Sequence, residues 1–385
     1  TISLHASYTF SYATNKEDVQ MRIGNLTFHR AENFGATIQA YALQTYLSQQ
    51  GHEAIIIDYR CPAIEMSYDL YNPRILLSRK NVAISLKSYL CRFKNIKDRI
   101  LKKKRFETFW STNYHLTNSF NSIKSDIGFD AYITGSDQVW NLHLTNGIDN
   151  MFFLSFPMRE GAKKISYAAS SENDPNGLLQ KNKYAICRLL SSFDHISVRE
   201  DFLKAELNEI VDMPITVCMD PTFLLDKKYY AVLSKKPMIN DKYVLVYHMT
   251  PKKEAVKLAD RIASIRGYKV IEVFGGYKNY RDSERYKCDL GPSEILGYIQ
   301  NAEIVITTSF HGLALSVIMN KEFWVINHSG NYRQKNLLNL LDLNDRLINK
   351  HEECPIDELI DYARLKSVLA VSIEKSKQFI IEALG

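Results

Sequence analysis

The chain has 385 residues, of which 45% are hydrophobic and 24% charged, a composition that indicates a folded globular protein and excludes a disordered one. This length exceeds what one compact core of ordinary size takes, so we expect two domains. The net charge of +6 is too diffuse to indicate a nucleic-acid partner, but it favours anionic ligands.

Cysteine usage and hydropathy indicate the cellular compartment in which we expect the protein. The six cysteines lie far apart without a CxxC pair, and scattered thiols of this kind are typical of a reducing cytoplasm. No apolar run reaches the roughly 18 residues that span a bilayer. Residues 1–20 lack both a basic leader and a continuous apolar run, so we expect an N-terminal extension of uncertain order rather than a secretion signal.

The first predicted elements form a βαβ unit. MRIGNLTF reads as a buried strand, and apolar residues then recur at helical spacing from Gly35 until Gly51 ends the helix. The run EAIIIDY, residues 53–59, is typical of a strand buried on both faces. A strand, a helix and a strand in succession predict a parallel sheet.

Residues 72–119 are mixed, basic and helix-prone, and we expect a helical insertion there. The segment RFKNIKDRILKKKRFETFW contains four consecutive basic residues, 102–105. One interpretation is the solvated face of a helix. The other is a basic amphipathic segment that touches anionic lipid or an acidic acceptor.

Further strands complete two α/β series. DAYIT, KISYAA, HISV and ITVCM belong to a first domain over residues 21–228, and a polar, proline-bearing linker follows at 229–241. The second domain, residues 242–350, contains the strands YVLVYHM, KVIEVF, EIVITT and FWVI, with Pro292 in the first turn of a helix. Residues 351–385 form a C-terminal helical segment. The predicted fold is α/β, with two Rossmann-like domains and a cleft between them.

Polar residues follow most of the predicted strands, where ligands bind in open parallel sheets. Each has an ordinary explanation: Asp220 before a proline is typical of a turn, Arg199 with Glu200 of a surface ion pair, and His248 of a packed ring. Their recurrence in both halves predicts a cleft that holds an anionic ligand. No GxGxxG, P-loop, GxSxG, HExxH or His/Cys cluster is present, so we expect no nucleotide fingerprint, no serine nucleophile and no bound metal.

In chain order, these motifs resemble those of the polysaccharide pyruvyl transferase family. The matching segments, over residues 21–348, are NFGATIQAYALQTYL, IIIDYR, KKKRFETFW, DAYITGSDQVWN, KISYAAS, ISVRED, MDPTFLL and GPSEILGYIQNAEIVITTSFHGLALSVIMNKEF. The resemblance implies a GT-B-like fold. It also implies transfer of pyruvate from phosphoenolpyruvate to sugar hydroxyls as a ketal, with release of phosphate, during biosynthesis of a capsule, an exopolysaccharide or another cell-surface glycan. No cofactor is implied, since phosphoenolpyruvate is the donor substrate.

The resemblance also assigns site residues. His311 is the expected general acid/base, because histidine titrates near neutrality. The donor's phosphate and carboxylate need fixed cations, for which Arg199 is the first candidate. Many relatives have arginine where this chain has Ser309, so Arg333 and Lys321 are candidates to supply the charge, with Ser309 and Gly312 also on the donor side. Residues expected on the acceptor side or lining the cleft are Asn33, Gly35, Ser136, Asp137, Gln138, Trp140 and Asp220.

Other functions stay open. One is a GT-B glycosyltransferase with a nucleotide-sugar donor, for which Glu294 and Glu303 are available acids. Another is a non-catalytic glycan-binding protein, in which replacement of His311 leaves binding intact. In a third interpretation His311 is a structural ring in the core. Expected partners are phosphoenolpyruvate and a saccharide acceptor; a lipid-linked acceptor would bring this cytoplasmic protein to the inner face of the membrane.

Overall fold

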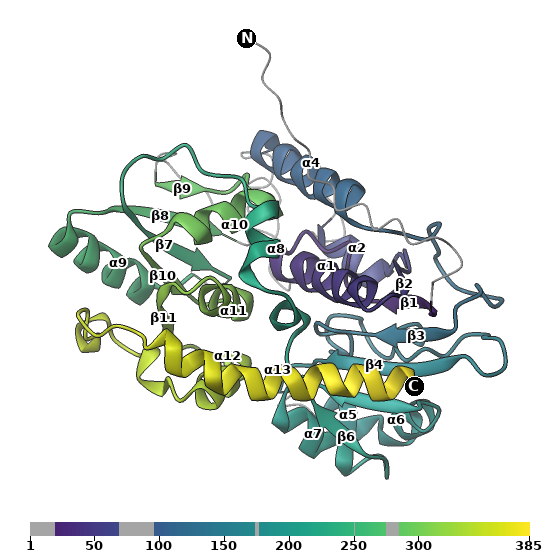
Figure 1. The fold of residues 1–385 in the computed structure, drawn as a ribbon. Helices are drawn as coiled ribbons and strands as arrows, with labels where there is room; N and C mark the ends of the chain where they lie inside the picture. The colour runs from purple at the N-terminus through teal and green to yellow at the C-terminus, as the bar shows by residue number, and fades with distance from the viewer. Residues whose placement is uncertain (1–19, 69–95, 174–176, 250, 275–284) are drawn as a thin grey trace, which may run out of the picture.

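The structure is a computed structural model that describes residues 20–68, 96–173, 177–249, 251–274 and 285–385 (Figure 1). Residues 1–19 of the expected N-terminal extension lie outside this part of the chain. So do residues 72–95 of the expected insertion and the glycines that follow the KVIEVF strand.

The first domain is built on a six-stranded parallel sheet with the order β2-β1-β3-β4-β5-β6. Its strands are β1 (Arg22–Leu26), β2 (Glu53–Ile56), β3 (Ala131–Thr134), β4 (Lys163–Ala169), β5 (His195–Val198) and β6 (Ile215–Val217). All four residues of β3 are buried. Strands covered on both faces in this way explain the apolar runs in the sequence.

Helices α1 (Phe34–Gln49), α2 (Pro62–Tyr68), α4 (Ile96–Asn113), α5 (Leu178–Lys181), α6 (Lys183–Leu190) and α7 (Asp201–Asn208) belong to this domain. Helix α1 begins where the Asn33 side chain accepts hydrogen bonds from the N–H groups of Gly35 and Ala36, at 2.9 and 3.3 Å. The chain then turns at Gly51, whose φ of 90° favours glycine. Most of α1 is buried, because it also contacts α10 and α11 of the second domain.

The second domain has a parallel six-stranded sheet of its own, in the order β12-β11-β10-β7-β8-β9. Its strands are β7 (Tyr243–His248), β8 (Lys269–Phe274), β9 (Tyr286–Lys287), β10 (Ile304–Thr307), β11 (Glu322–Ile326) and β12 (Leu347–Ile348). Its helices include α9 (Lys253–Arg266), α10 (Pro292–Asn301), α11 (Phe310–Ile318) and α12 (Tyr332–Leu341). The predicted α/β fold with two Rossmann-like domains is confirmed.

Between the sheets lie the short 3-10 helix η2 (Pro221–Leu224) and helix α8 (Lys227–Leu233). Helix α8 occupies the beginning of the predicted linker and packs against α10. It is anchored by the buried Tyr230, whose hydroxyl donates to the Thr222 carbonyl at 2.6 Å. The segment is therefore partly ordered by packing, in spite of its polar sequence.

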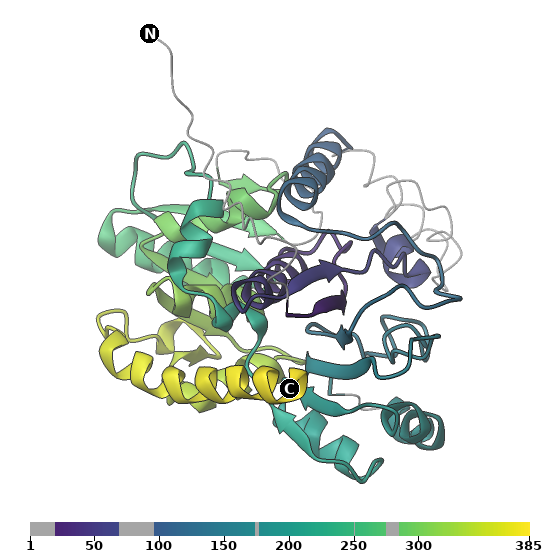
Figure 2. The same cartoon turned by 45° about the vertical axis from the view of Figure 1, so that its right-hand side comes forward.

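The last helix, α13 (Tyr362–Leu384), crosses back to the first domain and runs along both domains in both views (Figures 1 and 2). Ser376 on α13 accepts a hydrogen bond from the Met219 N–H at 2.8 Å. Lys163 of β4 donates to the Leu384 carbonyl at 2.6 Å. The end of the chain therefore ties the two domains together.

Helix α4 forms a second tie. Arg105 pairs with Asp289 of the second domain at 2.7 Å, and Lys102 is only 3% exposed. Burial lowers the pKa of Lys102 to about 8. Two of the four basic residues in the 102–105 run thus face the protein, and Lys104 is exposed.

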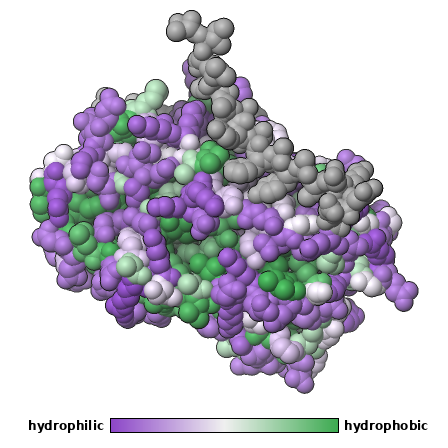
Figure 3. All heavy atoms as spheres, in the orientation of Figure 1, coloured by the Kyte–Doolittle hydropathy of each residue, from purple (hydrophilic) through white to green (hydrophobic). Residues whose placement is uncertain are grey.

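Hydrophilic residues cover much of the face shown in Figure 3, with apolar residues in small groups between them. Within the described ranges, no helix is both long and apolar enough to cross a bilayer. Cys61, Cys187, Cys218, Cys288 and Cys354 are free thiols.

Candidate active site

A cavity of about 320 Å³ lies between the domains, where the carboxyl ends of both sheets meet. We call it the central cavity. The first domain contributes Asn33, Tyr68, Asp137 and Gln138 to its lining, and the second contributes Ser309, His311, His328 and Arg333. The predicted cleft between the domains is confirmed.

Three helices begin at the central cavity. Asn33 caps α1 and Ser309 caps α11, accepting from the Gly312 N–H at 3.2 Å, and both caps line the cavity. Arg333, in the first turn of α12, lines it as well. Because the N-terminus of a helix carries partial positive charge, the three helices make the cavity favourable for an anion.

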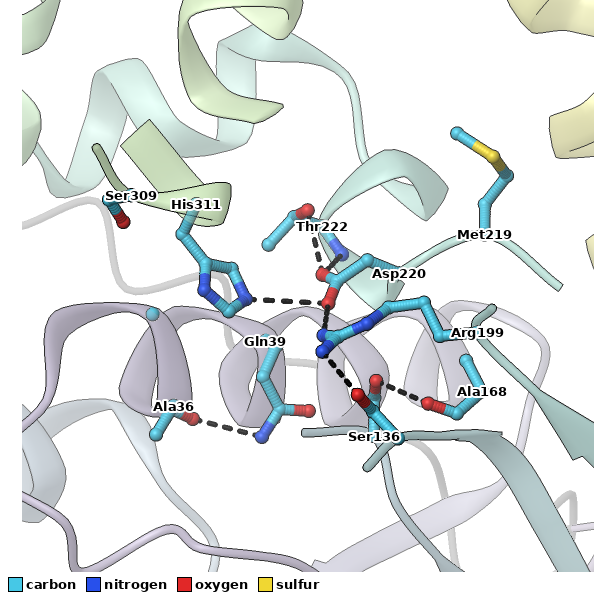
Figure 4. A network of polar contacts seen from close by, with 12 residues as sticks. Ala36, Gln39, Ser136, Ala168, Arg199, Met219, Asp220, Thr222, Ser309 and His311 are labelled. Carbon is cyan, nitrogen blue, oxygen red and sulfur yellow. Dashed lines mark hydrogen bonds and ion pairs between the residues drawn. The ribbon is translucent and has the colours of Figure 1, made fainter. Parts of the chain in front are cut away.

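His311 reaches from the second domain into the first (Figure 4). Its Nε2 lies 3.3 Å from Oδ2 of Asp220, and the residue is only 6% exposed. The ring also packs against α1, because a Cβ built on Gly35 would lie 1.9 Å from Nδ1 of His311. Two residues of the first domain therefore hold a ring that belongs to the second.

Asp220 follows β6 and has two functions. Its Oδ1 caps η2 by accepting from the Thr222 N–H at 3.0 Å, while Oδ2 faces His311 and Arg199. Burial acts to raise the pKa of Asp220, but the charges of His311 and Arg199 outweigh burial and hold the pKa well below its usual range. The resulting carboxylate lies beside Nε2 of His311 and can orient the ring.

Arg199 stabilises this carboxylate and does not line the central cavity. Its guanidinium donates to Glu200 at 2.9 Å, to Asp220 at 2.6 Å and to the Ser170 hydroxyl at 2.7 Å. The ring of Phe310 lies 4.6 Å from its Cζ. The expectation that Arg199 clamps the donor stays a prediction, although Glu200, Asp220 and the Ser170 hydroxyl already accept its hydrogen bonds.

Arg333 has its donors open. It lines the central cavity and two neighbours: a rear cavity of about 430 Å³, which Arg199 and Asp220 also line, and a side cavity of about 110 Å³. No hydrogen bond or ion pair joins its side chain to another residue in the described ranges. Burial and the charge of Arg199 lower the pKa of Arg333, yet an arginine keeps its positive charge at neutral pH.

Two donor-side candidates lie elsewhere. A Cβ on Gly312 would lie 2.4 Å from Oγ1 of Thr307, so this glycine allows α11 to pack closely on β10. Lys321 follows the far end of α11, donates to the Ala302 carbonyl at 3.0 Å and lines none of the three cavities.

The GSDQVWN segment divides between site and core. Asp137, with a φ of 63°, and Gln138 line the central cavity. Ser136 is fully buried and donates to the Ala168 carbonyl at 2.7 Å. Trp140 donates to the Phe152 carbonyl at 3.1 Å and stacks on Phe153, which makes it a core residue.

Sequence reasoning missed His328 and Tyr68. His328 follows β11, and its ring nitrogens lie 2.7 Å from the Ser329 carbonyl and 3.3 Å from the Thr308 carbonyl. The end of the predicted FWVI strand was a signal for it, because ligand-facing residues follow parallel strands. Tyr68 of α2 had no local signal, since only the tertiary fold brings it to the cavity.

Residues with other chemistry lie outside these cavities. His248 is 1% exposed, lies 3.4 Å from Glu272 and packs on Phe274, in agreement with the packed-ring interpretation. Ligand atoms of Glu254, His351 and Glu352 lie within 4.8 Å of one another and could hold a metal ion, but these three residues do not line the central cavity.

The two parallel sheets and the histidine–carboxylate pair between them define a two-domain α/β protein with its candidate active site at the domain interface. A family model described as polysaccharide pyruvyl transferase matches residues 33–330, a range that includes Asn33, Asp220 and His311. The chain therefore belongs to the polysaccharide pyruvyl transferase family, which is a family of transferases.

Several solved structures are similar in fold. UDP-N-acetylglucosamine 2-epimerase from Rickettsia bellii is 10% identical, with a TM-score of 0.46 over 94% of this chain and 97% of that one. UDP-GlcNAc 2-epimerase from Neisseria meningitidis, bound to UDP-GlcNAc, is 10% identical, with a TM-score of 0.45 over 94% and 98%. The E. coli heptosyltransferase WaaC with ADP is 10% identical, with a TM-score of 0.37 over 94% and 100%. No match is found among curated proteins.

Proposed function

We propose that this cytoplasmic protein transfers the pyruvate skeleton of phosphoenolpyruvate to two hydroxyls of a saccharide, as a cyclic ketal, during synthesis of a capsule, an exopolysaccharide or another cell-surface glycan. One observation carries the proposal beyond family membership. The His311–Asp220 pair and the open guanidinium of Arg333 line or adjoin a single cavity into which three helix N-termini lead.

The donor has two anionic groups, a phosphate and a carboxylate. Arg333 offers a planar fork of donors that matches either group, and the starts of α1, α11 and α12 add backbone N–H groups and partial positive charge. In this arrangement α12 supplies the cation that Ser309 does not. The proposal therefore needs no charge from Lys321, which lies at the other end of α11.

The proposed reaction balances without a cofactor. C3 of phosphoenolpyruvate takes up a proton, C2 bonds to the first hydroxyl oxygen, the bond between C2 and the phosphate oxygen breaks, and the second hydroxyl oxygen then bonds to C2. The two hydroxyl protons balance the proton gained by C3 and the one gained by phosphate. His311 is the proposed proton-transfer group, and Asp220 orients its ring.

Glu294 and Glu303, the acids available to a nucleotide-sugar transferase, have other roles. Glu294, in the first turn of α10, accepts a hydrogen bond from the Gly291 N–H at 3.2 Å and forms an ion pair with Lys235. Glu303 pairs with Lys242 at the start of β10. Because neither residue lines the central cavity, these residues give that alternative no support.

The test is phosphate release from phosphoenolpyruvate with a panel of sugar acceptors. We expect His311→Ala to lower the rate by about 10²–10⁴-fold, the usual contribution of a general acid/base. Arg333→Ala should raise the KM for phosphoenolpyruvate at least tenfold, whereas Lys335→Ala on the same helix, outside the three cavities, should match the wild type. No release with any acceptor, or a wild-type rate in His311→Ala, would contradict the proposal.

A thermal-shift titration separates the donors. Phosphoenolpyruvate at a hundred times its Kd should stabilise the protein by about 2.7 kcal/mol. Stabilisation by UDP-N-acetylglucosamine but not by phosphoenolpyruvate would favour the nucleotide-sugar alternative.

A lipid-linked acceptor would place the protein at the inner face of the membrane, and the exposed Lys104 on α4 supports such a contact. Sedimentation with anionic vesicles tests this, with Lys104→Ala as the variant. Equal sedimentation of the wild type and Lys104→Ala would mean that the basic run gives no reason to expect membrane contact.

A further inference from the structure

The side cavity adjoins the central cavity. Gln138, Gly330 and Arg333 line both, so Arg333 stands at their junction. The first domain contributes Glu172 and Phe202 to the side cavity and the second contributes Tyr332. A molecule seated there can extend past Arg333 toward the central cavity, which His311 lines.

The lining of the side cavity combines two kinds of surface. Tyr332 is 46% exposed, and its ring lies 6.3 Å from that of Phe202, centroid to centroid. The amides of Gln138 and Asn173 and the carboxylate of Glu172 supply hydrogen-bonding groups. A pyranose ring has the complementary surfaces, because its C–H face is apolar and its hydroxyls both donate and accept.

The other openings fit a sugar less well. The lining of the central cavity includes the apolar side chains of Ile64, Leu144 and Met249, which are poor partners for sugar hydroxyls. The rear cavity also has polar groups, and His311 lines neither it nor the side cavity. In the rear cavity, however, Arg199 and Asp220 are already paired with each other, and Asp220 also faces His311, so these two groups are occupied.

Charge narrows the class of sugar. The side chain of Glu172 is 45% exposed and lies 3.7 Å from His143, and Arg333 is already assigned to the donor. We propose that the side cavity binds the acceptor, and that this acceptor is an uncharged pyranoside rather than a uronic acid, with its apolar face on Tyr332 and Phe202. This inference rests on the proposed function, because it assumes that the donor occupies the central cavity.

The binding test uses a matched pair of ligands that differ only at C6, p-nitrophenyl β-D-glucopyranoside and p-nitrophenyl β-D-glucuronide, together with the neutral galactopyranoside and mannopyranoside. Saturation-transfer NMR should show binding of at least one neutral glycoside to the wild-type protein. The glucuronide should bind at least tenfold more weakly than the glucopyranoside, and Glu172→Gln should narrow that difference.

Tyr332→Ala should weaken binding of the neutral glycoside at least tenfold, while Tyr184→Ala, which removes an exposed tyrosine from α6, should not. The thermal shift with phosphoenolpyruvate should stay unchanged in Tyr332→Ala, which separates loss of the subsite from loss of the fold. Wild-type protein that binds no neutral glycoside, or a Tyr332→Ala variant that binds it as the wild type does, overturns the inference.

The two proposals fail in different ways. Phosphate release with an unchanged acceptor KM in Tyr332→Ala removes the side cavity as the acceptor site and leaves pyruvyl transfer intact. Binding that depends on Tyr332, without phosphate release from phosphoenolpyruvate, leaves a glycan subsite and removes pyruvyl transfer.

Discussion

At the scale of single residues, the absence of one side chain decides where the proposed proton-transfer group lies. Gly35 leaves the space that the imidazole of His311 fills, and Asp220 then faces the opposite nitrogen of the ring. Glycine in the first turn of α1 costs some helix stability relative to alanine. The site therefore keeps a residue that is less favourable for the helix, because the ring needs the space.

Gly35→Ala should separate activity from stability. The new Cβ would lie 1.9 Å from Nδ1 of His311, so the ring must move away from Asp220. We expect phosphate release to fall about 100-fold, the loss that a displacement of about 1 Å can cause. Thermal unfolding should change little, and Ser48→Ala at the other end of α1 is the matched control. A normal rate in Gly35→Ala would show that the ring does not act from this position.

Asp58 provides a pH test away from the proposed chemistry. Its buried carboxylate contacts His29 at 2.9 Å and Arg30 at 2.6 Å. Burial acts to raise the pKa of Asp58, but the hydrogen bonds from His29, Arg30 and Ser119 hold it well below the usual range. Since the folded pKa is depressed, the carboxylate stabilises the fold above the unfolded pKa of about 4 and loses that effect as the pH falls through the folded value.

Asp58→Asn should therefore unfold about 3 kcal/mol more easily at pH 7, as expected when one partner of a buried ion pair is removed. The gap from the wild type should narrow as the pH falls below about 4. Urea denaturation of both proteins between pH 7 and pH 3 measures it. A gap that widens toward low pH would mean that the folded protein does not favour the ionised carboxylate.

At the scale of elements, α13 of the second half buttresses a loop of the first. The Ser376 hydroxyl accepts from the Met219 N–H, immediately before Asp220. Ser376→Ala should cost about 1–3 kcal/mol, because it leaves a buried backbone donor without its partner. Ser367→Ala, on the exposed side of the same helix, should stay within about 0.5 kcal/mol of the wild type. Equal effects of the two substitutions in urea denaturation would argue against this role for α13.

Strands are the elements that could be read most directly from the sequence. HISV and KVIEVF match β5 and β8 residue for residue, because apolar runs buried on both faces leave a clear pattern. The run at 53–59 is a strand only as far as Ile56, since Asp58 turns to His29 and Arg30. Strands β9 and β12 have two residues each, too few to form a pattern.

The site was readable in part. The motif order pointed to His311, and the strand ends to Asp137, Gln138 and Asp220. Pairing between His311 and Asp220 was not readable, because it depends on how one domain docks on the other. For the same reason, the sequence suggested a donor clamp for Arg199, whereas its partners are decided by the packing of β5 and β6.

At the scale of the whole molecule, α4 and α13 hold the two domains together on different sides of the molecule (Figure 1). Arg105 and Asp289 form a partly buried pair across the interface, 26% and 27% exposed at their side chains. Arg105→Glu and Asp289→Lys should each cost about 1 kcal/mol or less, and the double variant should recover at least half of the loss. Urea denaturation of the wild type, the two single variants and the double variant gives the coupling free energy as a double-mutant cycle. Strictly additive losses would mean that the pair does not couple the domains.

His311 and Asp220 belong to different domains, and under the proposed function this division bears on how much donor is lost to hydrolysis. Under that proposal, a molecule with its halves apart would hold neither an oriented imidazole nor a closed cavity, so it would not react with phosphoenolpyruvate even with Arg333 in place. Under the proposed function, reactivity would appear only when the halves meet around their substrates, at which point little water remains to compete. Futile hydrolysis of phosphoenolpyruvate would then be limited by the way the chain is divided into domains.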